Sequence, residues 1–147
     1  MKNIFTLITL IFLSIVSINA QDNSTKKADK QFSRLEFVKA AESYKKLVNN
    51  GKSSDYVVSQ LAECYYNIYS TIEAEKWYAT LAEGSNDADV IYKYSQMLKA
   101  NGKYKLSNKW MSKFVELRPA DNRATAFMKD PNYLPKIISK GKRFNVQ

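Results

Sequence analysis

Small and large apolar side chains follow one another along this chain in a pattern that returns about every 34 residues. The central copy spans residues 61–81, where Ala62 and Ala74 stand among leucine, tyrosine and tryptophan side chains. Matching copies lie 34 residues earlier and 33 residues later. In each copy two small residues stand 12 positions apart: Ala28 and Ala40, Ala62 and Ala74, and Ser95 and Ser107.

This spacing predicts three helical hairpins stacked side by side. Two crossing helices need small side chains where their backbones approach, and large ones to fill the adjoining grooves. One hairpin cannot bury its own apolar face, so about three must stack to form a core. We therefore expect an all-α fold with hairpin units at residues 28–51, 54–84 and 87–119.

Turn and capping residues place the expected helices. Gly51 and Gly84 can adopt the left-handed backbone that ends a helix, and Ser70 with Glu73 has the spacing of a capping box. We expect helices at residues 28–35, 37–49, 88–100 and 104–117, two more beginning near Ser54 and Ser70, and a capping helix at residues 121–129. All three prolines follow the hairpins, so no proline interrupts the six helices before the cap.

The pattern resembles the tetratricopeptide repeat (TPR) family. In that family a large residue, a small residue and a later aromatic mark the first helix, and small, aromatic and apolar residues mark the second. The matching residues are Leu61, Ala62, Tyr65, Ala74, Tyr78 and Leu81, then Tyr94, Ser95, Leu98, Ser107, Met111, Phe114 and Pro119. The first unit departs from the pattern at Lys27 and Gln31. The resemblance implies a right-handed superhelical stack of three TPR hairpins that serves as a binding scaffold, and it names no partner.

The chain carries 23 basic and 14 acidic residues, a formal charge of +9. Without Lys2, which lies in a leader described below, 22 basic residues face 14 acidic ones, a balance of +8. Such a charge favours anionic protein surfaces, polysaccharide, lipid or nucleic acid as partners. The basic residues are spread along the helices, however, where a solvated face explains them as well. The densest group is Lys136, Lys140, Lys142 and Arg143.

The sequence offers little for catalysis or metal binding. It has no histidine, which excludes histidine triads, histidine bases and the commonest transition-metal ligand. The single cysteine, Cys64, can form neither an internal disulfide nor a thiolate cluster, and its helical position favours a small buried side chain over a reactive thiol. Glu73 and Glu75 are a conceivable acid–base pair, but the helix dipole explains them equally. We expect no enzyme, no cofactor, no metal ion and no small-molecule substrate.

Residues 1–20 predict a secretory signal peptide. Lys2 gives a positive start, residues 4–18 are almost wholly apolar, and Ala20 offers a small residue for cleavage. An uncleaved anchor is the alternative. The leader has no cysteine and so does not suggest a lipoprotein. We expect export to a bacterial periplasm, a flexible lead-in at residues 21–27, and a capping helix with a C-terminal tail at residues 120–147.

A signal peptide, a few TPR units and a Gly-Lys-Arg-Phe tail together resemble the N-terminal part of a family of larger periplasmic proteins of the Bacteroidota. Those proteins continue into a β-propeller and a peptidoglycan-binding OmpA-like domain, and members are associated with type IX secretion and gliding motility. Residues 28–47 and 130–143 carry the resemblance. This sequence has neither later domain, so we expect a fragment or a short stand-alone relative. The resemblance implies a protein partner in the envelope or outer membrane, and peptidoglycan only through a further domain.

The first helix of each hairpin is expected to line a concave face, where side chains are free to bind a partner. The repeat alignment puts these residues on that face: Tyr56, Ser59, Glu63, Tyr66, Asn67, Tyr92, Gln96 and Lys99, with Asp29 and Phe32 as an extension. Tyrosine suits recognition because it offers a large contact area with few rotors. The alternative is that Tyr66 and Tyr92 pack between repeats. Asp29 and Glu63 would repel a terminal carboxylate, so we do not expect the chaperone-binding TPR class.

The sequence leaves three hypotheses for the function. The first is a periplasmic protein–protein interaction scaffold of a cell-envelope assembly that binds an extended segment in its groove. The alternative is a binder of anionic cell-wall glycan or lipid through the basic C-terminal segment, with attraction that salt would screen. An enzyme is the third, although no phosphate-binding loop or nucleophile motif supports it. Nucleic acid is not an expected partner, because the compartment is wrong and no recognition motif is present.

Overall fold

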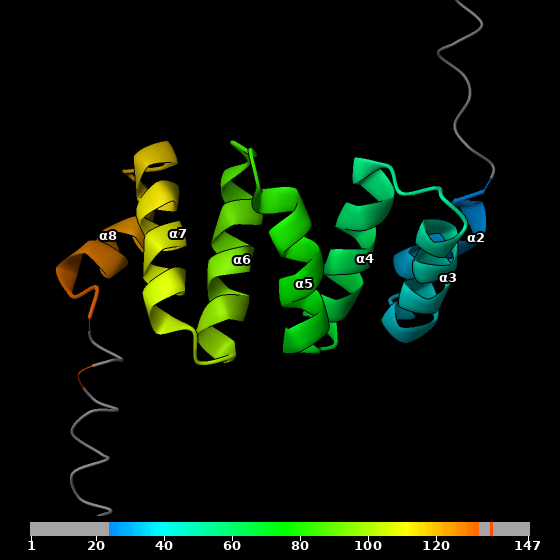
Figure 1. Cartoon of the computed structure of the whole chain (residues 1–147), viewed down its shortest axis with the longest axis horizontal. Helices are drawn as coiled ribbons and strands as arrows, with labels where there is room; N and C mark the ends of the chain where they lie inside the picture. The colour runs from blue at the N-terminus through cyan, green and yellow to red at the C-terminus, as the bar shows by residue number, and fades with distance from the viewer. Residues whose placement is uncertain (1–23, 133–135, 137–147) are drawn as a thin grey trace, which may run out of the picture.

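The computed structural model describes residues 24–132 and residue 136, which form an all-α fold (Figure 1). Seven helices follow one another along these residues: α2 (Lys26–Ser33), α3 (Phe37–Asn49), α4 (Asp55–Asn67), α5 (Thr71–Ala82), α6 (Ala88–Ala100), α7 (Tyr104–Leu117) and α8 (Asn122–Lys129). No strand occurs in this described part. The predicted signal peptide and most of the predicted C-terminal tail, including three of its four clustered basic residues, lie outside the described residues.

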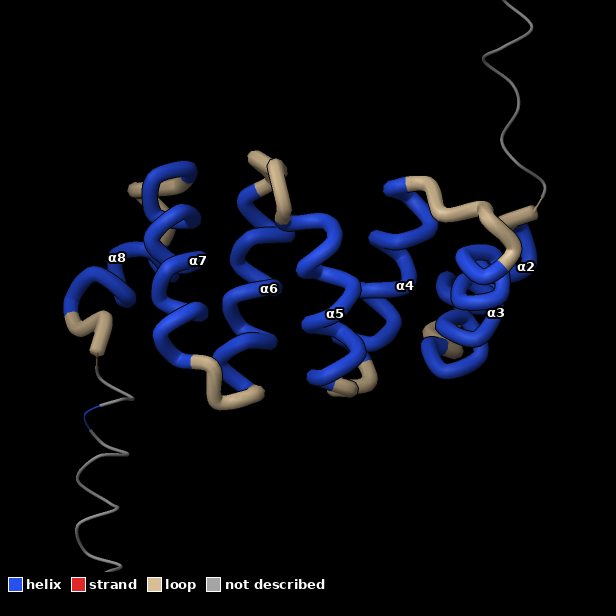
Figure 2. The backbone as a smooth tube through the Cα atoms, viewed as in Figure 1, coloured by secondary structure: helices blue, strands red, loops and turns tan. Residues whose placement is uncertain are grey.

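Each helix packs against its neighbours in sequence, so the described chain forms three hairpins and a closing helix. The hairpins are α2–α3, α4–α5 and α6–α7. The turns inside the hairpins lie along the lower edge of the stack, and the turns between hairpins lie along its upper edge (Figure 2). We call the edge formed by the α2–α3, α4–α5 and α6–α7 turns the turn edge.

The paired small residues lie where the two helices of each hairpin cross, as the sequence predicts. All six are at most 2% exposed: Ala28, Ala40, Ala62, Ala74, Ser95 and Ser107. In the third hairpin serine replaces alanine, and the Ser107 hydroxyl donates a hydrogen bond to the Ser95 carbonyl oxygen at 2.8 Å. A buried hydroxyl is tolerated because it is hydrogen-bonded.

The core consists of three apolar clusters, and each joins one hairpin to the first helix of the next unit. One cluster spans α2, α3 and α4, the second α4, α5 and α6, and the third α6, α7 and α8. In the last cluster Ala124 of α8 is fully buried against Met111 and Phe114 of α7. Helix α8 therefore covers the end of the stack, which confirms the predicted capping helix.

The helix termini confirm most of the predicted signals. The Ser54 hydroxyl accepts a hydrogen bond from the Val57 N–H at the start of α4. Gly51 and Gly84 have φ of 77° and 74°, the left-handed backbone that glycine adopts without strain. Helix α2 covers Lys26–Ser33 and thus lies two residues nearer the N-terminus than expected. Its first turn includes two residues of the predicted flexible lead-in.

The predicted capping box of Ser70 and Glu73 does not form. Ser70 precedes α5, but its side chain caps nothing. A capping box needs the Ser70 N–H as donor to Glu73, and that N–H already donates to the Tyr65 carbonyl oxygen at 2.9 Å, closing the end of α4. The turn is too short to serve both helices, so a Glu73 carboxylate oxygen is buried without a partner among the described residues.

Candidate functional site

Two adjoining cavities form a groove on the face that α4 and α6 share. A cavity of about 460 Å³ lies between α6, α7 and α8, and one of about 470 Å³ lies between α4, α6 and the start of α7. Both are lined by Tyr92, Gln96, Lys99 and Tyr104, so they are continuous. We call the combined surface the C-terminal groove. Each of the two volumes lies within the range of natural ligand-binding clefts.

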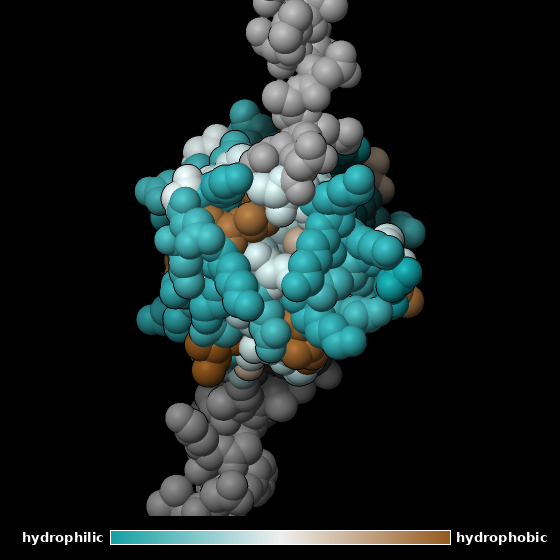
Figure 3. All heavy atoms as spheres, turned by 90° about the vertical axis from the view of Figure 1, so that its right-hand side faces the viewer, coloured by the Kyte–Doolittle hydropathy of each residue, from teal (hydrophilic) through white to brown (hydrophobic). Residues whose placement is uncertain are grey.

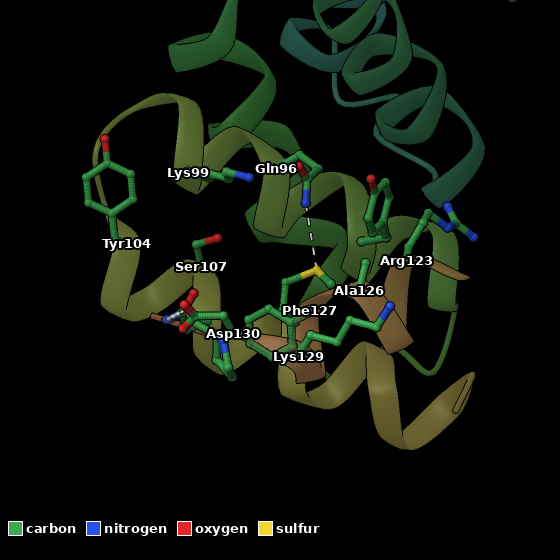
Figure 4. Close-up of a pocket in the computed structure, with 13 residues that line it drawn as sticks. Gln96, Lys99, Tyr104, Ser107, Arg123, Ala126, Phe127, Lys129 and Asp130 are labelled. Carbon is green, nitrogen blue, oxygen red and sulfur yellow. Dashed lines mark hydrogen bonds between the residues drawn. The ribbon is translucent and has the colours of Figure 1, made fainter. Parts of the chain in front are cut away.

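Three helices contribute side chains to the groove between α6, α7 and α8 (Figure 4). Gln96 and Lys99 come from α6, one turn apart, and Ser107 comes from α7. Phe127 and Lys129 of α8 close the opposite side. Positions three or four apart on a helix share a face, which is why Gln96 and Lys99 point to one space.

The structure brings together four of the eight residues that the sequence proposes for partner binding. Tyr66, Tyr92, Gln96 and Lys99 line the C-terminal groove. Ser59 lines a different cavity of about 430 Å³, together with Asp55 and Val90. The other three, Tyr56, Glu63 and Asn67, form hydrogen bonds within the chain.

Glu63 is held by side chains of α5 and α6 rather than left free for a partner. The Tyr78 hydroxyl of α5 donates to its Oε1 at 2.7 Å, and the Lys93 ammonium of α6 donates to the same oxygen. Burial, and then the bond to Glu63, raise the pKa of Tyr78 well above its ordinary range. The hydroxyl therefore stays protonated and donates at any physiological pH.

Asp29 occupies the same place in the first hairpin. The Tyr44 hydroxyl of α3 donates to its Oδ1 at 2.6 Å, and the Tyr56 hydroxyl of α4 donates to it at 2.8 Å. Burial alone would raise the pKa of Asp29, but bonds from Tyr44, Thr25 and Tyr56 outweigh it and lower this pKa. Asp29, which we expected to extend the binding surface, is thus engaged in hydrogen bonds within the chain.

The third hairpin breaks this pattern. Gln96 stands where the other hairpins have a carboxylate, and Met111 stands where they have tyrosine. The Gln96 amide donates weakly to the Met111 sulfur at 3.7 Å (Figure 4). An uncharged amide and a flexible thioether replace a charged hydrogen-bonded pair, and both line the cavity between α6, α7 and α8.

The two groove tyrosines also pack on the stack. Tyr66 meets Tyr78 edge to face with ring centroids 6.0 Å apart, and Tyr92 lies 5.2 Å from Phe114. The Arg123 guanidinium of α8 covers the Tyr92 ring at 4.4 Å. Tyr66 and Tyr92 remain partly exposed, so each combines packing contacts with some surface on the groove.

The groove carries uncompensated positive charge. Arg123 is paired with Asp121 at 2.8 Å and with Asp89 at 3.4 Å, and the first of these bonds lowers the pKa of Asp121 to about 2. Within the described residues, Lys99 and Lys129 have no acidic partner. The repulsion of carboxylates expected from Asp29 and Glu63 therefore does not extend to this end of the chain.

Sequence reasoning missed the part of the groove that α8 supplies. It treats residues 121–129 as a cap, yet Arg123, Phe127 and Lys129 line the cavity. The 34-residue repeat could have revealed this contribution, because it places Arg123 at the position in α8 that Asp89 occupies in α6. In the structure these two residues are also in contact. Helix α8 takes the place of a fourth first helix, and such helices carry the groove residues.

Groups with other chemistry are few in the described residues. Cys64 is fully buried, and burial raises the pKa of its thiol to about 12, so the thiol is protonated at neutral pH. No cluster of three metal-ligating side chains occurs among residues 24–132 and 136. None of the helices in the same range is long and apolar enough to cross a membrane.

Comparison with known proteins does not indicate a function for the groove. The chain matches no known protein family and no curated protein. The all-helical stack is compatible with a helical repeat.

Proposed function

We propose that this chain is a TPR-type interaction scaffold of a bacterial cell-envelope assembly. In this proposal it is exported to the periplasm, is not an enzyme, and binds an extended segment of a partner protein in the C-terminal groove. The sequence arrangement suggests type IX secretion or gliding motility as the setting. The carrying observation is that Tyr66, Tyr92, Gln96 and Lys99 line one continuous groove.

The groove favours a segment with an aromatic or apolar side chain next to an acidic one. Tyr92, Met111 and Phe127 supply apolar lining, and tyrosine and methionine adapt to varied side chains. Lys99 and Lys129 supply positive charge at the rim. Charges of this kind set specificity and association rate more than affinity.

Affinity capture from a native envelope extract tests the proposal, with residues 21–147 as bait. Replacement of both Tyr66 and Tyr92 by alanine removes the aromatic lining, and we expect it to abolish capture of the partner. Because Tyr92 also contacts Phe114 and Arg123, circular dichroism must first show that this variant keeps its helices.

A second pair of variants separates the groove from general charge. Lys99→Glu reverses a charge inside the groove, whereas Lys109→Glu makes the same change on α7 outside it. We expect Lys99→Glu to weaken capture about tenfold or more and Lys109→Glu to leave it within a factor of two. A photo-cross-linker at Gln96 should trap the same protein. Equal capture by all variants would reject this groove.

A further inference from the structure

The exposed apolar side chains of the described residues gather on the turn edge. Eight large hydrophobic residues are exposed, and six of them lie in or beside the turns inside the hairpins: Leu35, Val38, Ile68, Tyr69, Ile72 and Leu106. Viewed from the α2–α3 end, brown hydrophobic surface appears at the lower rim of the stack, and a further brown patch lies higher on the same face (Figure 3). On the opposite edge, Tyr56 is the exposed hydrophobic residue, and its hydroxyl donates to Asp29.

Two of these side chains occupy strained backbone. Leu35 and Tyr69 have φ of 59° and 56°, where Gly102 of the third hairpin has 76°. All three residues end a first helix in the same way, since the next N–H bonds back across the turn at 3.0, 2.9 and 2.8 Å. Glycine adopts this conformation freely, whereas leucine and tyrosine do not.

The strain does not serve the core, because both side chains point to solvent. Leu35 and Tyr69 are each 71% exposed. Ile72, in the first turn of α5, is 76% exposed and stabilises nothing by burial. Retained strain of this kind points to a use outside the folded chain.

The charges of the turn edge favour an anionic surface. Lys39 engages Glu36 at 3.1 Å, and Lys103 engages Glu75 at 2.6 Å. Arg34 and Lys105 are exposed and have no acidic partner among the described residues.

The opposite edge carries unpaired charges of both signs. Its exposed basic residues without an acidic partner among the described residues include Lys26, Lys46 and Arg118. There Arg123 is engaged by two carboxylates, while Asp55, Glu83 and Asp87 have no basic partner within the same described range. The exposed apolar side chains therefore share the turn edge with Arg34 and Lys105, whereas the opposite edge carries charges of both signs.

We propose that the turn edge rests on the surface of an anionic lipid bilayer. The aliphatic side chains of Leu35, Val38 and Ile72 enter the headgroup boundary, and Arg34 and Lys105 face the lipid charges. A second copy of the chain fits less well, because the free charges on two such edges would repel. The contact meets the proposed groove at Tyr69, which lines both surfaces, and leaves Gln96 and Lys99 open to a partner.

Vesicle co-sedimentation tests the proposal with residues 21–147, because the apolar leader would bind lipid by itself. All core clusters of the described residues lie between Ala28 and Ala124, so this form retains them, and circular dichroism checks its helices. We expect binding to vesicles of phosphatidylglycerol and phosphatidylcholine, and weaker binding to phosphatidylcholine alone. Leu35→Gly with Ile72→Ser should reduce that binding about tenfold or more.

Matched variants keep the outcome decisive. Met128→Ser removes an exposed apolar side chain on α8 and should leave binding unchanged. Arg34→Glu with Lys105→Glu should weaken binding about threefold or more, and Lys26→Glu with Lys46→Glu, away from the turn edge, should weaken it less. The proposal is overturned if the unaltered chain ignores anionic vesicles, or if the turn-edge variants bind them equally well. A solution dimer lost in Leu35→Gly with Ile72→Ser would also overturn it and assign the edge to a second copy.

Discussion

The second and third hairpins are built on one plan and differ in the side chains that lie between their two helices. In α4–α5 the Tyr78 hydroxyl bonds to Glu63, and Lys93 shares that carboxylate. In α6–α7 the corresponding residues, again 15 positions apart, are Met111 and Gln96, joined by a weak amide–sulfur contact. The charged group links α4 to both α5 and α6. The neutral pair leaves a cavity of about 460 Å³ beside it.

This difference separates residues that fold the chain from residues that are available to bind. A carboxylate on the first helix of a hairpin looks like part of a recognition surface, yet Asp29 and Glu63 both accept hydrogen bonds from buried tyrosines. Such groups must be satisfied internally because an unpaired buried hydroxyl is costly. The candidate site lies in the third hairpin, where Met111 replaces the buried tyrosine and Gln96 has no hydroxyl to satisfy.

The largest expected effect comes from enlarging the small residues at the two crossings. Ala74→Leu adds three carbons at a fully buried position between α4 and α5, and overpacking should lower the free energy of unfolding by about 3 kcal/mol. Ser107 lines the cavity, so Ser107→Leu has adjoining space and should cost about 1 kcal/mol less. Urea unfolding measures both, and equal costs would show that the two crossings are equally tight.

A smaller effect is expected from the tyrosine hydroxyl. Tyr78→Phe removes the bond to Glu63 and should lower the free energy of unfolding by about 2 kcal/mol, as for hydrogen bonds to charged groups. Met111→Leu in the third hairpin keeps the volume and should cost less than about 1.5 kcal/mol. If thermal unfolding ranked Met111→Leu as the more damaging change, the two crossing points would not differ as described.

The smallest effect concerns the left-handed turn residues. A side chain at Gly102 would meet nothing within 4 Å, so Gly102→Ala tests backbone strain alone and should cost about 1 kcal/mol. Leu35→Gly removes such strain and should raise the free energy of unfolding by up to about 1 kcal/mol, less the greater freedom of glycine in the unfolded chain. Calorimetry that found Leu35→Gly destabilising would show that the leucine contributes to the fold.

The sequence predicts the helices well, because each has a clear apolar face and clear turn residues. The bounds of α3, α6 and α7 agree with those expected, and glycine or asparagine follows two of them in the turn. It does not predict that Leu35 and Tyr69 take a left-handed backbone, since neither residue favours it. The missing capping box has a similar cause, because one N–H at Ser70 could serve only one helix end.

The candidate site is less predictable than the fold. Repeat alignment correctly places Tyr66, Gln96 and Lys99 on a common face, because that depends on helical periodicity. It cannot show which side chains are already bound within the chain, since the bond between Tyr78 and Glu63 depends on the distance between two helices. The alignment also does not predict the groove residues of α8, because residues 121–129 are expected only to cap the stack.

Partner capture by a chain with Gln96→Glu and Met111→Tyr tests the central claim most directly. These changes install in the third hairpin the pair found in the other two, and tyrosine fills part of the cavity. We predict a chain that keeps its helical circular dichroism and no longer captures the partner that the unaltered chain binds. A folded variant that captures the partner as strongly as before would contradict the assignment of binding to the C-terminal groove.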